Sequence, residues 1–133
     1  MSGKVLRVET PGLMSTIQDQ GRFGYQYYGI STSGASDQRA LRLGNLLLGN
    51  DVGDAAVEIT FGGFAIVFTA ATAFAISGAD LSPTLNGTPI STGVVYMVMP
   101  DDKLVMAAPV SGFRSYLHLP GGVVCDQVLG SAA

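Results

Sequence analysis

Apolar residues in this chain occur mostly in short runs that alternate with polar positions or are cut by glycine, a pattern typical of β-strands. Strands are predicted at residues 5–9, 14–17, 57–61, 64–68, 73–77, 94–99, 104–107 and 114–119. Many of these runs are rich in β-branched or aromatic residues, which favour pleated structure. In the first run Arg7 and Glu9 alternate with apolar residues, which indicates an edge-like strand. The pattern therefore predicts a mainly β protein.

Two turns divide the second half of the predicted strands. The dipeptide Asn86-Gly87 stands between residues 84–85 and 89–90, and this pair is a strong signal for a two-residue hairpin. A second turn is expected at Pro100-Asp101-Asp102, between the runs at 94–99 and 104–107. We expect these strands to close, or half close, into a barrel.

One helix is predicted, beginning at Ser36-Asp37, where either side chain can cap the free N–H groups of the first turn. Gly49-Asn50 is expected to end it, because both residues tolerate a left-handed backbone. The predicted apolar stripe comprises Ala40, Leu41, Leu43, Leu47 and Leu48. The predicted polar face comprises Gln38, Arg39, Arg42 and Asn45.

Length and composition predict one domain, residues 1–133, with a core that needs no disulfide support. The uncharged run Ile59–Ala79 is long enough to cross a bilayer, but Gly62-Gly63 and its threonines favour two short strands with a turn. The chain has 7 basic and 10 acidic residues, a net charge of −3, which argues against a nucleic-acid or an anionic membrane partner. The single Cys125 predicts neither a disulfide framework nor a metal site, and a reducing cytoplasm is the expected location.

Polar residues gather in the glycine-rich segment Thr16–Asp37. Polar groups near buried surface are costly unless they have partners, and glycine lets a backbone approach a ligand closely. We expect a site there. Its candidate catalytic residues are Gln18, Asp19, Arg22 and Asp37, and its candidate substrate-binding residues are Gly21, Gly24, Tyr25, Ser33, Gly34 and Ala35.

These residue types suit an anionic or amide-bearing ligand. Arg22 offers a bidentate fork, and the residues before the helix lead to free N–H groups that favour an anion. Each role has a structural alternative: Arg22 pairs with Asp19, Asp37 is only a helix cap, and Tyr25 is packing at the rim. His118 is expected to be a turn-adjacent or barrel-lining residue.

Several segments resemble the biotin-dependent carboxyltransferase family. They read T-x-Q-D-x-G-R-x-G-Y-Q from Thr16, G-I-x-x-S-G-A-x-D from Gly29, L-x-x-G-N from Leu46 and E-I-T-F-G-G from Glu58. Further along come S-G-A-D from Ser77, R-x-Y-L from Arg114, Gly121-Gly122 and V-L-G-S from Val128. The family includes the second subunit of allophanate hydrolase, the C subunit of 5-oxoprolinase and the KipA-like proteins.

The resemblance implies a cyclophilin-like β-barrel, of which this chain represents an N-terminal portion, because family members are about twice as long. It also implies a small amide or carboxylate substrate and a sister protein, which would be allophanate hydrolase subunit 1, the B subunit of 5-oxoprolinase or a KipI-like protein. Biotin, as carboxybiotin, or ATP would act through partner domains. Three alternatives stand: an enzyme component, a non-catalytic KipA-like interaction module, and an inactive truncated fragment.

Overall fold

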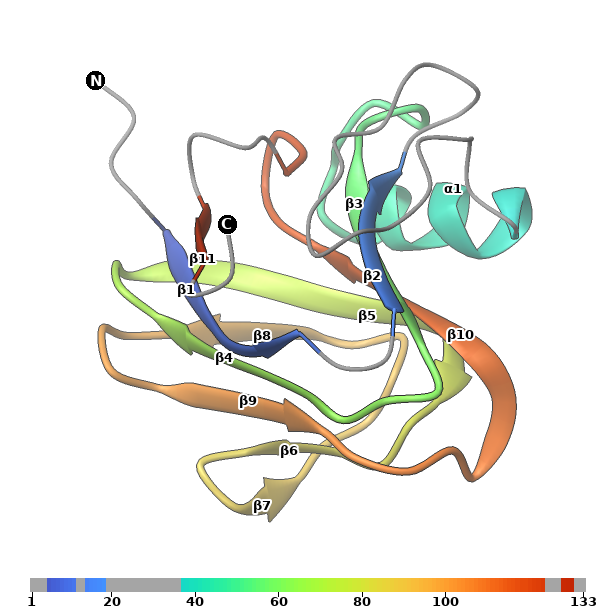
Figure 1. Ribbon diagram of the computed structural model, residues 1–133. Coiled ribbons are helices and arrows are strands. Elements are labelled where there is room, and N and C mark those ends of the chain that lie inside the picture. The colour runs from blue at the N-terminus through green and yellow to red at the C-terminus, as the bar shows by residue number, and fades with distance from the viewer. Residues whose placement is uncertain (1–4, 12–13, 19–36, 124–127, 131–133) are drawn as a thin grey trace.

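The computed structural model describes residues 5–11, 14–18, 37–123 and 128–130 (Figure 1). Within these residues the chain forms two β-sheets and one α-helix. The prediction of a mainly β protein with one main helix is therefore confirmed. No helix in the described part of the chain is long and apolar enough to span a membrane.

The first sheet has six strands in the order β11-β1-β4-β9-β6-β7. Its strands are β1 (Leu6–Pro11), β4 (Phe64–Phe68), β6 (Pro83–Leu85), β7 (Thr88–Pro89), β9 (Lys103–Met106) and β11 (Val128–Gly130). The edge-like prediction for β1 is wrong, because β1 pairs antiparallel with β4 on one side and parallel with β11 on the other. The alternation of Arg7 and Glu9 marks the solvent face instead, where Glu9 lies 3.2 Å from the Lys103 ammonium.

The second sheet is antiparallel and has the order β2-β3-β10-β5-β8. Its strands are β2 (Met14–Gln18), β3 (Ala56–Thr60), β5 (Thr72–Asp80), β8 (Val95–Val98) and β10 (Ser111–His118). The turn at residues 100–102 leads from β8 in this sheet to β9 in the other, so it changes sheets and makes no hairpin. Among the described strands no pairing closes either sheet into a ring, so the expected barrel closure is not found.

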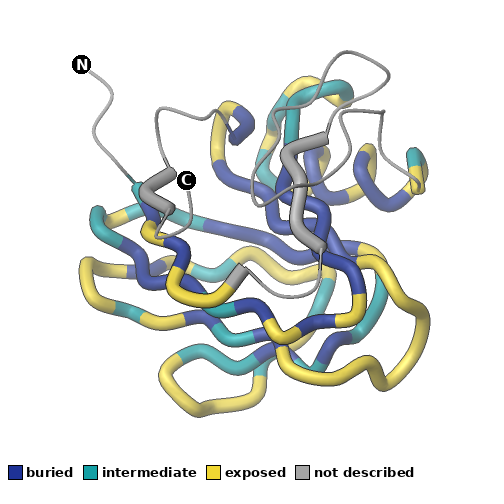
Figure 2. Tube along the Cα trace, viewed as in Figure 1, coloured by how far each residue is buried: buried dark blue, intermediate teal, exposed yellow. Residues whose placement is uncertain are grey.

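The hydrophobic core lies between the two sheets (Figure 2). The first sheet contributes Leu6, Val8, Phe64, Ile66, Phe68, Leu104 and Met106, and the second contributes Val57, Ile59, Phe74, Ile76, Val98 and Leu117. The rings of Phe68 and Phe74 stack across the core with centroids 5.3 Å apart. The Asn86-Gly87 hairpin joins β6 to β7, and both of its residues have positive φ, as a type I′ turn requires.

The helix α1 (Gln38–Leu47) packs on β5 and β10, on the face of the second sheet that points away from the core (Figure 1). The Asp37 side chain accepts the Ala40 N–H at 3.0 Å, which confirms the predicted cap. Gly49, with φ 71°, follows the end of the helix as predicted.

The predicted apolar stripe of α1 is wrong in part. Ala40 and Leu41 are buried, but Leu43 and Leu47 are exposed. Asn45, predicted on the polar face, is fully buried. The buried stripe is Ala40, Leu41, Gly44 and Asn45. Ala40 and Gly44 have the smallest side chains of the four, which lets the helix backbone lie close to the sheet.

Candidate functional site

Most of the predicted site residues lie outside the described residues. These are Asp19, Gly21, Arg22, Gly24, Tyr25, Ser33, Gly34 and Ala35. Gln18 is the last residue of β2. Asp37 is the candidate whose side chain the structure describes, and it caps α1. The convergence of Arg22 with the helix start therefore stays a prediction.

A β-bulge separates β10 from β5 beside the first turn of α1. Ser111 pairs with Asp80, and Ser115 pairs with Gly78. Between these two pairs β10 carries residues 112–114, whereas β5 carries only residue 79. Extra residues of this kind bend a strand and are common next to active sites. The bulge brings together the S-G-A-D and R-x-Y-L segments.

Gly78 is required where the two strands separate. Its φ is +85°, and a Cβ at this position would lie 2.8 Å from the Arg114 carbonyl oxygen. A larger residue would be strained in backbone conformation and would also push β10 away. Gly78 therefore sets how closely the bulge approaches β5.

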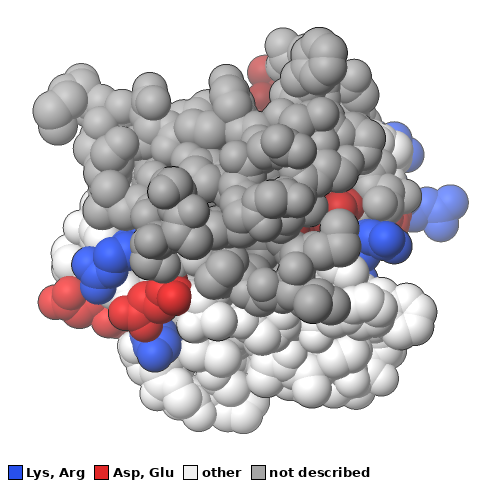
Figure 3. Space-filling view, viewed as in Figure 1, with Lys and Arg blue, Asp and Glu red and all other residues white. Residues whose placement is uncertain are grey.

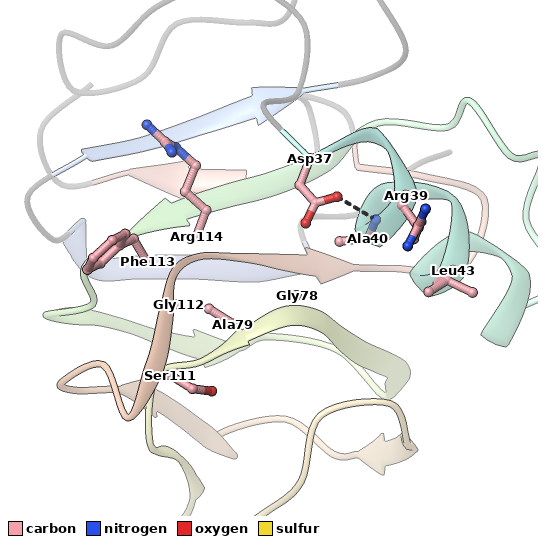
Figure 4. A pocket seen from close by; sticks show the side chains of 10 residues that line it. All are labelled: Asp37, Arg39, Ala40, Leu43, Gly78, Ala79, Ser111, Gly112, Phe113 and Arg114. Carbon is pink, nitrogen blue, oxygen red and sulfur yellow. Dashed lines mark hydrogen bonds between the residues drawn. The ribbon is translucent and has the colours of Figure 1, made fainter.

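A cleft of about 590 Å³ lies between α1 and the bulge (Figure 4). The helix side supplies Asp37, Arg39, Ala40 and Leu43, and the sheet side supplies residues 78–79 and 111–114. The volume is in the range of small-molecule sites. The exposed residues Phe61 and Phe113 pack edge-to-face, with ring centroids 5.2 Å apart, and Phe113 lines the cleft.

The cleft carries two arginines, one on each wall. Arg39 begins the helix wall and Arg114 ends the bulge (Figure 4). Both are exposed, and neither forms an ion pair with any residue that the structure describes. The space-filling view shows arginine and lysine side chains in two places, beside acidic side chains at the lower left and along the right edge (Figure 3). Asp37 also faces the cleft, but its Oδ1 is held by the Ala40 N–H. Two guanidinium groups that have no carboxylate partner among the described residues are suited to an anionic ligand.

A buried phenol fixes the helix wall from below. The Tyr116 hydroxyl accepts the backbone N–H of Asp37 at 2.8 Å and donates to Glu58 Oε2 at 2.5 Å. Tyr116 is fully buried and Glu58 nearly so. Burial, and then the hydrogen bond to Glu58, raise the pKa of Tyr116 above its usual range. The hydroxyl therefore stays protonated and keeps both contacts.

A second buried network crosses from the sheet to the helix at His118. Its Nε2 lies 2.8 Å from Ser77 Oγ, and its Nδ1 lies 3.2 Å from Asn45 Oδ1. Burial lowers the pKa of His118 to about 4, so the ring is neutral at neutral pH. Serine, histidine and asparagine in this order resemble a nucleophilic triad. However, His118 and Asn45 are fully buried and Ser77 does not line the cleft, so a substrate has no access to Ser77 Oγ.

The sequence analysis missed Arg39 and Arg114 as site residues and Asn45 as a buried partner of His118. For Arg114 a signal was present, because the R-x-Y-L segment is one of those quoted for the family resemblance. For Asn45 the signal was its spacing of four from Leu41, which places it on the buried stripe. No group of three or more metal-ligating side chains occurs in the described part of the chain.

Together the two sheets, the helix and the arginine-lined cleft define a mainly β protein with a cleft at a strand bulge. Residues 28–133 match the family model for the carboxyltransferase domain, subdomain A and B. The chain belongs to this carboxyltransferase domain family, and the resemblance found in the sequence is confirmed.

Relatives of known name agree with this membership. The chain is 37% identical over 129 residues to the C subunit of 5-oxoprolinase from Escherichia coli, a match that covers 97% of the chain and 42% of the relative. It is 36% identical over 127 residues to urea amidolyase of Saccharomyces cerevisiae, a match that covers 95% of the chain and 7% of the relative. The crystal structure of Kluyveromyces lactis urea carboxylase matches with TM-score 0.79 and 34% identity, over 92% of this chain and 11% of that one. The chain thus spans about two fifths of the E. coli relative.

Proposed function

We propose that this chain is the substrate-binding portion of a carboxyltransferase-type subunit and that the cleft beside the bulge receives an anionic or amide-bearing small molecule. The observation that carries the proposal is the pair of arginines, Arg39 and Arg114, that face one cleft without carboxylate partners among the described residues. The names of the relatives suggest a lactam such as 5-oxoproline or a urea-type compound as substrate.

The cleft suits carboxyl transfer because negative charge moves onto oxygen during that reaction. Donors that are already in place stabilise such charge without reorganising. Arg114 would hold a carboxylate or a ureido oxygen, and Arg39 would hold a second oxygen from the opposite wall. Carboxybiotin, when bound, supplies an activated carboxyl group, and the volume and donors of the cleft fit its ureido ring. The predicted loop residue Arg22 would add a further guanidinium.

Further parts of the proposal concern what surrounds this chain. A sister protein would complete the enzyme, in the manner of allophanate hydrolase subunit 1, the B subunit of 5-oxoprolinase or a KipI-like protein, and ATP would bind there. Two relatives are named as the C subunit of 5-oxoprolinase, a name that implies other subunits and so supports this part. A cyclophilin-like fold and a cytoplasmic location also belong to the proposal.

The test combines the chain with a sister subunit and measures ATP-dependent turnover of 5-oxoproline and, separately, carboxybiotin-dependent carboxylation of urea. Arg114→Ala should lower kcat/KM by roughly 10²-fold, and Arg114→Lys should recover only part of this, because lysine lacks the bidentate fork. Arg42→Ala is the matched control, since Arg42 is an exposed arginine of α1 that does not line the cleft. Equal effects of Arg114→Ala and Arg42→Ala would refute the role of the cleft.

A non-catalytic KipA-like interaction module is the second candidate. It is favoured by the exposed apolar side chains Leu46 and Leu47 of α1, which do not line the cleft and are 60% and 42% exposed. Exposed apolar patches of this kind mark interaction surfaces. This candidate predicts that Leu46→Glu abolishes binding of the sister subunit while Arg114→Ala leaves it intact, with no turnover by either protein. If the chain neither binds the sister subunit nor supports turnover, the remaining alternative is the inactive truncated fragment.

A further inference from the structure

His118 lies where a buried side-chain network joins β5 and β10 to the second half of α1. It is the last residue of β10. Its ring reaches Ser77, which immediately precedes the cleft-lining residues Gly78 and Ala79, and Asn45, a buried residue of α1, the helix that supplies the other wall. We propose that His118 is a positioning residue: its imidazole, bonded to Ser77 and Asn45 at once, sets the position of α1 over the sheet and thereby the shape of the cleft.

The hydrogen-bond pattern fixes which nitrogen of the ring carries the proton. The Asn45 Nδ2 group donates to the carbonyl oxygens of Val52, at 3.1 Å, and Asp54, at 2.8 Å. The Asn45 Oδ1 atom must therefore face His118, and it can only accept a hydrogen bond. Nδ1 consequently carries the proton, and Nε2 is left to accept the Ser77 hydroxyl hydrogen. The network has one consistent arrangement, so the ring has one orientation.

Close packing makes the helix sensitive to this ring. A Cβ added to Gly44 would overlap the imidazole, so the backbone of α1 rests directly on His118. No side chain stands between them to absorb a change. The thickness and orientation of the imidazole therefore determine how far this part of α1 stands above β5 and β10.

The helix is held at two separate points. Tyr116 holds the N–H of Asp37 at its start, and His118 holds Asn45 eight residues later, about 12 Å further along the axis at 1.5 Å per residue. Loss of the His118–Asn45 contact leaves the Tyr116–Asp37 contact intact, so the helix can tilt without detaching from the sheet. Arg39 and Leu43 lie between the two points and would move relative to Gly78.

This inference rests on the proposed function only because it takes the cleft as the substrate-binding site. Its test uses neither a substrate nor a partner protein. His118 is the only histidine in the sequence, so its ring signals need no assignment. A long-range proton–nitrogen NMR spectrum at neutral pH should show a neutral ring with the proton on Nδ1. A charged ring, or a proton on Nε2, would overturn the arrangement. A negative turnover assay would leave this result unaffected.

Substitutions then test positioning. His118→Leu, which keeps much of the bulk of the ring but removes both bonds, should shift the backbone amide signals of Arg39, Leu43 and Gly78. It should also raise hydrogen exchange in the second half of α1 by roughly tenfold. His118→Gln, which retains a donor and an acceptor, should recover part of both effects. If His118→Leu does not fold, Ser77→Ala removes one bond and should give the same pattern more weakly.

The matched control is Ser82→Ala, which removes the 2.9 Å bond from Ser82 Oγ to the Ala108 carbonyl, remote from α1. It should leave the amides of Arg39, Leu43 and Gly78 unchanged. If the network only stabilises the fold, the His118 and Ser77 variants should be less stable, but the amide signals of Arg39, Leu43 and Gly78 should not shift. That result would refute the positioning role.

Discussion

The substitution Tyr116→Phe removes one buried hydroxyl group. It should weaken the attachment of α1 to the sheet more than the other hydroxyl-removing substitutions described above. The substitution keeps the ring in place. It takes away the acceptor of the Asp37 N–H and the donor to Glu58 Oε2. Both contacts connect residues far apart in the sequence, so nothing local replaces them.

The expected loss follows from the kind of hydrogen bond removed. A hydrogen bond to a charged group contributes about 1.5–3 kcal/mol, and one between neutral groups about 0.5–1.5 kcal/mol. Tyr116 is fully buried, so water cannot substitute for the missing hydroxyl without opening the structure. The free energy of unfolding should therefore fall by about 2–4 kcal/mol, a large fraction of the stability of a typical domain.

Urea denaturation followed by circular dichroism measures this change. With an m-value of about 2 kcal/mol/M, in the middle of the range for small proteins in urea, the midpoint should fall by roughly 1–2 M at unchanged slope. The control is Tyr96→Phe, since the Tyr96 hydroxyl accepts the Ser91 N–H at 2.9 Å in an exposed setting. That variant should lose less than about 1 kcal/mol.

A double-mutant cycle with Glu58→Gln isolates the pair. The two substitutions together should cost clearly less than the sum of the single costs, because Tyr116→Phe removes the hydrogen bond that Glu58→Gln weakens by replacing the carboxylate acceptor with an amide oxygen. Additive costs, or a Tyr116→Phe loss no greater than that of Tyr96→Phe, would refute the reasoning that the buried phenol holds the helix.

Three further predictions follow from the same structure. Burial lowers the pKa of His118 from 6.5 to about 4, so the unfolded chain binds a proton at a higher pH than the folded protein does. The free energy of unfolding should therefore fall by about 3 kcal/mol as the pH falls from 6.5 to 4. Urea denaturation over this range should show a flatter pH dependence in His118→Gln. Gly62→Ala should cost more than about 2 kcal/mol, since its φ is +90° and the new Cβ would overlap the Ala107 carbonyl oxygen. Gly87→Ala, with φ +83° and open space around it, should cost only about 1–2 kcal/mol, and thermal melts of the two variants measure the difference. Asp37→Ala should cost about 1 kcal/mol through loss of the cap, and Asp37→Asn much less, as measured by helix circular dichroism.

The sequence predicted what depends on neighbouring residues. The cap at Asp37 and the Asn86-Gly87 hairpin each involve a few adjacent positions, and their chemistry is specific to one local geometry. The strands were also placed to within a few residues. Each of these features could be predicted before any tertiary contact was known.

The rest depends on contacts between distant segments. Whether Asn45 faces water or His118 depends on a residue 73 positions away, and helical periodicity alone does not reveal it. The bulge at residues 112–114 is a shift of register within the pairing of β10 with β5, which neither strand encodes alone. The polar alternation in β1 likewise marked an exposed face and was mistaken for a free edge. The cleft, which depends on α1 and the bulge together, was therefore beyond sequence reasoning.

The parallel pairing of β1 with β11 has a consequence for how the protein is made. Leu6 finds its neighbour Val128 only after nearly all the intervening chain exists. During synthesis on the ribosome, the backbone N–H and C=O groups of β1 that pair with β11 remain unpaired while the other strands emerge. Pairings between such distant segments slow folding, and an unpaired edge invites association with another nascent chain. Early synthesis is thus the stage at which this molecule should depend most on chaperones.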